Sequence, residues 1–280
     1  MSSLTIDDVR ARHPEPFRQA SRRLQIQVGA VAACLAYGLF CAWLFDVSWQ
    51  RLTAGLGRIG VVFGQMLVWK DFWSWDFEGI FLGLGQSLAM AFLGTIMASL
   101  VALPLAFLAA RTVVRPALPR HVIRRLFDML RGIDQLIWAL VFVRALGLGP
   151  LSGLLAIFTS DIGTLGKLYS EALENVDRKQ VEGVRATGAS RMQVYRFGFL
   201  PQIFPVFLSQ TLYYIESNTR SATVLGVVGA GGIGLQLSER MKVQYWDQAA
   251  FIMLLILLTV SLVDQASALI RRRFIGGPSR

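Results

Sequence analysis

Residues Gly79–Ala110, GIFLGLGQSLAMAFLGTIMASLVALPLAFLAA, form a run of 32 residues without a charged side chain. A helix crosses the hydrocarbon core of a bilayer with about 20 mostly apolar residues, so this run is long enough for one tilted helix. Pro104 lies inside the run and is expected to kink its last third. Such a run does not suit a water-solvated surface and indicates a membrane-spanning protein.

The composition of the whole chain agrees with this interpretation. Of the 280 residues, 54% are hydrophobic and 16% are charged, and the mean hydropathy is +0.50. These values argue against a soluble enzyme, a disordered chain and a disulfide-stabilised domain. The 28 Lys and Arg residues outnumber the 18 Asp and Glu residues. They cluster between apolar segments, so membrane lipids rather than nucleic acid are the expected surroundings.

Further apolar segments predict an all-α, polytopic membrane protein with six transmembrane helices. The first segment follows a basic tail and lacks a cleavage site, so it is expected to be a retained anchor helix rather than a signal peptide. Besides Gly79–Ala110, the predicted spans are residues 24–45, two helices within 126–168 joined at the turn Gly147-Leu148-Gly149-Pro150, residues 197–215 and residues 248–270.

The basic residues assign a side of the membrane to each connection. Twenty of the 28 lie in residues 1–23, 111–125, 167–200 and 271–280, and five lie in the alternate connections. Cytoplasmic connections carry the excess of Lys and Arg, so both termini are predicted to be cytoplasmic. The outer segment from Asp46 to Phe77 is expected to hold interfacial anchors, namely Trp49, Trp69, Trp73 and Trp75.

The inner segment between the fourth and fifth spans has an amphipathic pattern. Val184, Gly188, Met192 and Tyr195 recur at three- and four-residue spacing, which predicts a short helix with a sharp turn at Gly188. Pro201 is expected to start the next span. A helix of this kind projects from the membrane and can dock in a groove of another protein.

This inner segment resembles the coupling loop of ABC importer permeases. The pattern of that loop is Glu-Ala-Ala, three residues, Gly, nine residues, Ile, any residue and Leu-Pro. Here Gly183-Val184 replaces Ala-Ala and Gly198 replaces Ile. The resemblance implies that this chain is coupled to an ATPase through Glu182, Gly183, Val184, Ala186, Gly188, Ala189, Leu200 and Pro201.

The same resemblance implies a fold and an assembly. The fold is that of type I ABC importer permeases, and the location is a bacterial inner membrane. The assembly contains a second copy of this chain, two ABC ATPase subunits and a periplasmic or lipid-anchored substrate-binding protein. ATP and Mg²⁺ would bind to the ATPase subunit, and no cofactor to this chain. The sequence agrees, because it contains no Gly-x-x-x-x-Gly-Lys-Ser/Thr phosphate-binding loop.

A polar group follows the fifth predicted span. Glu216 and Arg220 stand four residues apart, the helical spacing of an ion pair, at the predicted outer end of that span. Polar groups in a membrane face a bundle interior or a water-filled pathway, so the pair either holds helices together or contacts an anionic substrate. The candidate pathway residues are Glu216, Asn218, Arg220, Ser221 and Thr223, with Asp161 and Asp264 as further carboxyl groups that could belong to a pathway.

Residues 229–234, Gly-Ala-Gly-Gly-Ile-Gly, match the dinucleotide fingerprint Gly-x-Gly-x-x-Gly. No βαβ unit surrounds them, so nucleotide binding is a poor fit. Glycines also allow close helix contacts and non-helical backbone inside a membrane protein. We therefore expect a broken or re-entrant element near the outer mouth, in which Gly229, Gly231, Gly232 and Gly234 either gate the pore or pack.

A narrower resemblance covers about Gln86 to Phe274. The stretches 181–189, 216–224 and 226–234 are similar to the phosphonate-transporter permease branch of the same family. This resemblance implies import of a phosphonate, phosphite or a related phosphorus oxyanion. The alternative is another small anion or small molecule carried by the same type of importer.

Other functional classes lack their required residues. An enzyme needs a nucleophile and a base at recognisable spacing, and the sequence shows no such arrangement. A metal site needs several ligands, and His13 and His121 have no matching ligands in the sequence. A passive channel needs no projecting coupling segment. We expect a non-catalytic subunit with three parts: residues 1–77 (cytoplasmic tail, anchor helix and outer segment), residues 78–274 (permease core with coupling loop 171–201) and residues 275–280 (cytoplasmic tail).

Overall fold

The computed structural model describes residues 14–46, 48–113 and 116–275, and these residues form helices and turns without a strand. Contacts divide the chain into residues 1–64 and residues 65–280. The sequence predicts the division after residue 77 instead. The predicted tail 275–280 lies outside the described residues except for Ile275, and so do residues 1–13.

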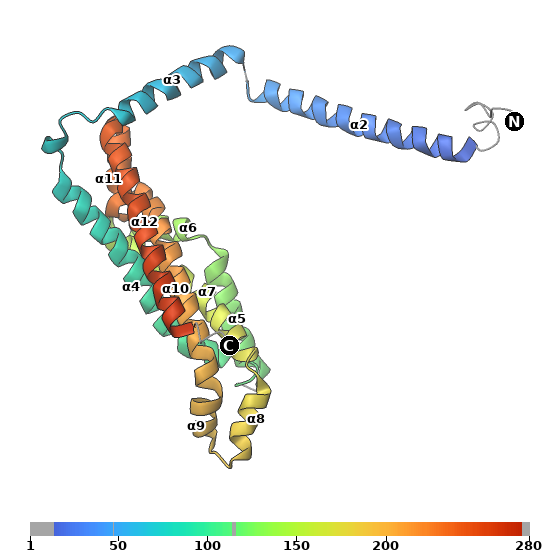
Figure 1. Cartoon of the computed structure of the whole chain (residues 1–280), viewed down its shortest axis with the longest axis vertical. Helices are drawn as coiled ribbons and strands as arrows, with labels where there is room; N and C mark the ends of the chain where they lie inside the picture. The colour runs from blue at the N-terminus through green and yellow to red at the C-terminus, as the bar shows by residue number, and fades with distance from the viewer. Residues whose placement is uncertain (1–13, 47, 114–115, 276–280) are drawn as a thin grey trace. The chain divides into compact units, whose positions relative to one another are not determined.

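The first unit consists of α2 (Pro14–Leu44) and most of α3 (Trp49–Leu67) (Figure 1). Residues 25–44 of α2 are long and apolar enough to cross a membrane, as expected of the anchor helix. Helix α3 is not among the predicted spans, because Arg51 and Arg58 interrupt its apolar run. Its first turn is fixed locally: Arg51 forms an ion pair with Asp46 at 2.6 Å and donates its backbone amide to Ser48 Oγ at 3.3 Å.

The second unit is a helical bundle in which α4 packs against α7, α10 and α11 (Figure 1). Its elements are η1 (Phe72–Ser74), α4 (Phe77–Ala109), α5 (Ala117–Gly132), α6 (Gln135–Leu146), α7 (Pro150–Glu174), α8 (Arg178–Ala186), α9 (Arg191–Val194), η2 (Tyr195–Phe199), α10 (Leu200–Leu225), η3 (Gly226–Ala230), α11 (Gly232–Lys242) and α12 (Trp246–Ile275).

Small residues let the helices of the bundle approach closely. One face of α4 carries a row of fully buried alanines, which pack against Phe127 of α5 and against Leu165 and Tyr169 of α7. Gly166 of α7 leaves room for Phe127, since a Cβ atom at this position would collide with the ring. Small residues at helix contacts are typical of membrane bundles, where van der Waals packing replaces the hydrophobic effect as the driving force. The alanines are Ala98, Ala102, Ala106 and Ala109.

Among the described residues, three helices are long and apolar enough to cross a membrane: Gln25–Leu44, Phe77–Ala109 and Trp246–Arg273. A bent pair, Arg191–Ala230 and Gly232–Lys242, forms a fourth candidate with a bend of 58°. The structure differs from the prediction of two spans within residues 126–168. Their first helix is split at Gly132, which leaves the 12-residue α6, about 18 Å long against about 30 Å for a bilayer core. Their second helix, α7, has 25 residues but contains Asp161 and Lys167.

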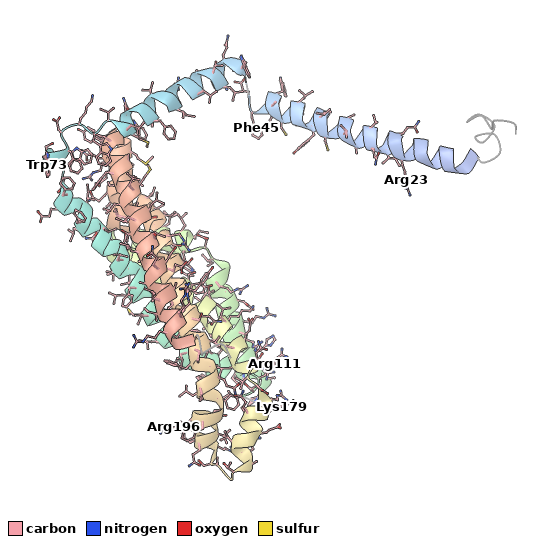
Figure 2. The ribbon with its side chains drawn as sticks, in the orientation of Figure 1. Arg23, Phe45, Trp73, Arg111, Lys179 and Arg196 are labelled. Carbon is pink, nitrogen blue, oxygen red and sulfur yellow. The ribbon has the colours of Figure 1, made fainter. Side chains whose placement is uncertain are left out.

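The two ends of the second unit differ in chemistry. Arg111, Lys179 and Arg196 lie toward one end, which also carries α8 and α9, and Trp73 lies at the opposite end (Figure 2). We call the first the coupling end. We call the other the aromatic end, because Phe251 of α12 contacts Trp69, Phe72, Trp75 and Phe77 there, with ring centroids 5.8–5.9 Å apart.

The tryptophans of the outer segment divide between two environments. Trp73 is 92% exposed, as expected of an interfacial anchor, whereas Trp75 is 7% exposed and packs inside the aromatic cluster. The indole nitrogen of Trp75 donates to the Lys70 carbonyl at 3.0 Å. Trp75 therefore closes the end of the bundle instead of anchoring in the interface.

Candidate functional site

The polar segment of α10 presents two different faces. Glu216 and Arg220 form the ion pair that their spacing predicts, at 3.6 Å. Both also contact α12: Arg271 lies 3.2 Å from Glu216, and Asp264 lies 3.6 Å from Arg220. These contacts favour the interpretation in which the pair holds helices together.

The position of this pair corrects the sequence prediction. Glu216 contacts Arg271 in the last turns of α12, so the pair lies within α10 beside that helix and not at the end of its own helix. The prediction placed the end of the span at Ile215 because the apolar run stops there. In the structure, the first part of that run belongs to η2, next to the coupling helices, and α10 continues to Leu225.

The other face of α10 contributes to a buried polar cluster. Asn218 donates to Asp161 Oδ2 of α7 at 2.5 Å and to Thr95 Oγ1 of α4 at 2.7 Å. Gln135 of α6 donates to Asn218 Oδ1 at 3.0 Å and to Asp161 Oδ1 at 3.2 Å. Asp161 and Asn218 are each 1% exposed. Four helices thus meet at one set of hydrogen bonds, in which the side chains satisfy one another.

A polar cavity of about 380 Å³ adjoins this cluster, between α5, α6, α7 and α10. This volume falls within the range of about 300–1,000 Å³ that is typical of small-molecule sites. Its polar lining comprises Arg131, Asp134, Gln135, Ser160, Asp161, Thr164, Tyr214, Ser217, Asn218 and Ser221. Guanidinium and hydroxyl groups are the donors that an oxyanion requires.

The structure places the predicted pathway residues at three different sites. Asn218 and Ser221 line the polar cavity, and Glu216 and Arg220 face α12. Thr223 donates to the Arg220 carbonyl at 2.7 Å and lines a small, mainly apolar pocket. Arg131, Tyr214 and Ser217 also line the cavity and are not among the predicted pathway residues. The spacing of residues 214, 217, 218 and 221 could have revealed them, because it defines one polar stripe along a helix.

The predicted coupling segment folds into two short helices. Asp177 caps the N-terminus of α8, where its side chain accepts the Lys179 amide at 2.9 Å, and α9 begins with a capping box between Ser190 and Gln193. The turn between them has Gly188 at φ 77°, as its sequence position predicts. α10 then starts at Leu200-Pro201. Of the predicted coupling residues, Val184 and Ala189 are half-buried and Glu182, Gly183, Ala186, Gly188, Leu200 and Pro201 are exposed.

Gly198, which departs from the importer pattern, has a packing role. A Cβ atom at this position would lie 3.3 Å from Val181 Cα, and both Val181 and Gly198 are buried. Gln202 strengthens the same junction: it accepts the Asp177 amide at 3.0 Å and donates to the Gly198 carbonyl at 2.7 Å. α8 is therefore attached to the start of α10, and the two helices are expected to move together.

The glycine run forms the broken element that its composition predicts. Gly229, Gly231 and Gly232 have φ values of 98°, 76° and 73°, and the chain bends between η3 and α11. Ser87 of α4 accepts the Ile233 amide at 2.9 Å, and Gln86 accepts the Gly232 amide at 3.2 Å. A Cβ atom at Gly234 would collide with the Thr223 carbonyl. All four predicted glycines are buried, and these contacts account for them by packing.

Comparisons with known proteins agree with this architecture. The family model described as "Binding-protein-dependent transport system inner membrane component" matches residues 102–275. A similar protein is HtxC of Stutzerimonas stutzeri, which is provisionally named as a phosphite transport system permease protein. It is 38% identical over 83% of this chain and 82% of its own length. The phosphite transport system permease protein PtxC of the same organism is 37% identical over 89% of this chain and 90% of its own length.

A solved structure supports the fold. A chain of the MetNI methionine ABC transporter in an inward-facing conformation superposes with a TM-score of 0.61 at 20% identity, covering 71% of this chain and 97% of that chain. At this identity the likeness shows the fold alone. Together with the family match and the apolar helices, it establishes a multi-pass membrane protein. The chain belongs to the family of binding-protein-dependent transport system inner membrane components, the permeases of ABC importers.

Proposed function

We propose that this chain is the permease subunit that carries phosphite, a phosphonate or a related phosphorus oxyanion into the cytoplasm. The observation that carries the proposal is the polar cavity beside α10, where Arg131 and several hydroxyl groups line one space. The names of the two relatives, both given to phosphite transport, support the same substrate class.

The proposed assembly contains two copies of this chain, two ABC ATPase subunits and a substrate-binding protein outside the membrane. ATP and Mg²⁺ bind to the ATPase subunits, so this chain has no catalytic role of its own. Both termini are cytoplasmic, in agreement with Arg111, Lys179 and Arg196 at one end of the second unit (Figure 2).

The coupling segment supplies the contact with the ATPase. Met192 is 76% exposed and Phe197 is 60% exposed, so the tip of the segment presents apolar surface next to basic residues. Amphipathic helices of this kind dock into grooves. Movement of α8 is transmitted to α10 through Gln202 and Gly198, and α10 carries the lining of the cavity.

A reconstituted importer tests the proposal. The chain is placed in lipid with its candidate ATPase and binding protein, and ATP hydrolysis and anion uptake are measured with phosphite, methylphosphonate, phosphate or sulfate. We expect stimulation and uptake with a phosphorus oxyanion. Stimulation by a different small anion would favour the alternative, an importer of the same type with another substrate. Failure to associate with any ATPase would contradict the permease function.

A further inference from the structure

The cavity beside α10 contains hydrogen-bond donors that no other described group uses. The hydroxyl groups of Tyr214, Ser217 and Ser221 line it, and none has a hydrogen-bond partner within residues 14–46, 48–113 and 116–275. Their spacing of three and four residues places them along one side of α10. Arg131 of α5 lines the same cavity and forms no ion pair within these ranges. One positive charge and three free hydroxyl groups thus line the same space as the carboxyl groups of Asp134 and Asp161.

The cavity also contains one deeply buried acceptor. Asp161 is 1% exposed, and its carboxyl group receives hydrogen bonds from the neutral amides of Gln135 and Asn218, with no Lys or Arg of the described chain within ion-pair distance. A carboxylate offers about four acceptor sites, so capacity for another donor remains. The second carboxyl group of the cavity, on Asp134, accepts the Leu136 amide at 2.8 Å as the N-cap of α6.

An anion can approach an ionised, buried carboxyl group only if the anion itself carries a proton, because two ionised oxygens repel each other. Phosphorus oxyanions satisfy this condition. A phosphate monoester loses its second proton at about pH 6, so near neutral pH such anions exist partly as a singly charged form with a P–OH group. Sulfate has no such proton at neutral pH, and neither does a monoester of a phosphonate.

We propose that this cavity is a transit site selective for the singly protonated form of the phosphorus oxyanion, an inference that rests on the proposed function. Arg131 and the hydroxyl groups of Tyr214, Ser217 and Ser221 donate to the anionic oxygens. Asp161 accepts the hydrogen bond of the P–OH group. The permease itself thereby distinguishes anions with an exchangeable proton from those without one, in addition to any selection by the binding protein.

Binding to the permease–ATPase complex without the binding protein tests the site directly. Inorganic phosphite is observed by ³¹P NMR line broadening in the presence of the detergent-solubilised complex, and competitors are added. For the wild type we expect that methylphosphonate displaces phosphite at least ten-fold better than sulfate does. Monomethyl methylphosphonate, which has one negative charge but no P–OH group, is the charge-matched control and is expected to compete as poorly as sulfate.

Two variants assign the roles of the charged residues. Arg131→Gln is expected to lose the broadening at least ten-fold, whereas Arg144→Gln, an exposed arginine of α6 outside the cavity, should keep it. Asp161→Asn supplies an amide donor in the same shape, so sulfate and the monoester should compete with phosphite in this variant. Arg131 is exposed, so Arg131→Gln keeps the test valid even if Asp161→Asn does not assemble.

The results separate this inference from the proposed function. Equal competition by sulfate and methylphosphonate in the wild type overturns the selective site, and so does unchanged exclusion of sulfate in an assembled Asp161→Asn complex. If the reconstituted importer still takes up phosphite in either case, the proposed function stands while the site is rejected. Selective broadening that Arg131→Gln removes supports the site, whether or not uptake has been reconstituted.

Discussion

Arg271 Nη2 lies 3.2 Å from Glu216 Oε2, and this contact joins the basic end of α12 to the polar segment of α10. Glu216 also pairs with Arg220, which in turn contacts Asp264. The carboxyl group of Glu216 is thus shared between two arginines from different helices. Its removal leaves Arg271 without this partner at an interface where side chains are only partly solvated.

We therefore expect Glu216→Gln to destabilise the packing of α12 against α10. The loss is about 1–2 kcal/mol, since a hydrogen bond to a charged group contributes on this scale. Thermal unfolding of the purified complex, followed by tryptophan fluorescence, measures the change. A double-mutant cycle with Arg271→Gln should give a coupling energy of about 0.5–1 kcal/mol. Additive effects of the two substitutions would show that this contact contributes nothing to stability.

Gly198→Ile restores the residue of the importer pattern and is nevertheless expected to impair coupling. The added side chain begins 3.3 Å from Val181 Cα, so α8 must shift away from the start of α10. ATP hydrolysis should become insensitive to the loaded binding protein, while the complex remains assembled. The measurement is the ratio of stimulated to basal ATPase activity. Val181→Ala in the same chain should partly restore this ratio, and a normal ratio for Gly198→Ile alone would contradict the packing argument.

Gly231→Ala tests the packing role of the glycine run. Gly231 has φ 76°, and a Cβ atom there would lie 2.8 Å from the Pro150 nitrogen. Backbone strain and the clash together should destabilise the protein by more than about 1 kcal/mol. Gly85→Ala in α4 is the matched control, because no atom lies within 4 Å of its Cβ position. Its expected effect is a stabilisation of about 0.5–1 kcal/mol, and equal unfolding temperatures for the two variants would refute the role assigned to Gly231.

The sequence predicts local features better than contacts between distant segments. The turns at Gly147–Pro150 and Gly188, the start of α10 and the broken glycine element follow from glycine and proline chemistry, which acts within a few residues. The contact between Glu216 and Arg271 could not be predicted, because it depends on how α12 packs along α10. Likewise, Asp161 and Asn218 are 57 residues apart, and only the folded chain brings them together.

Helix α3 and the split between α5 and α6 escaped prediction for a different reason. Arg51 and Arg58 interrupt the apolar run of α3, although a helix at a membrane surface tolerates arginine on its polar side. Residues 126–146 read as one predominantly apolar segment, but the structure separates α5 from α6 after Gly132. The length of an apolar run therefore predicts the bounds of α4 and α12 well. It predicts poorly the bounds of helices that are short or surrounded by other helices.

Met192 at the tip of the coupling segment provides a test of the contact with the ATPase. Its side chain is 76% exposed, and apolar side chains at the centre of an interface commonly account for much of the binding free energy. Met192→Glu puts a charge into that contact and should weaken association with the ATPase at least ten-fold, which corresponds to about 1.4 kcal/mol or more. Co-purification at increasing dilution measures the loss.

The matched control is Met241→Glu on α11, a methionine that is 40% exposed and belongs to a different part of the bundle. It introduces the same acidic group far from the coupling segment, so association with the ATPase should be unchanged. If both variants retain the ATPase equally, the tip of α9 does not contact it, and the docking surface must then lie elsewhere on the coupling segment. A loss that is confined to Met192→Glu would place the ATPase at the exposed face of α8 and α9.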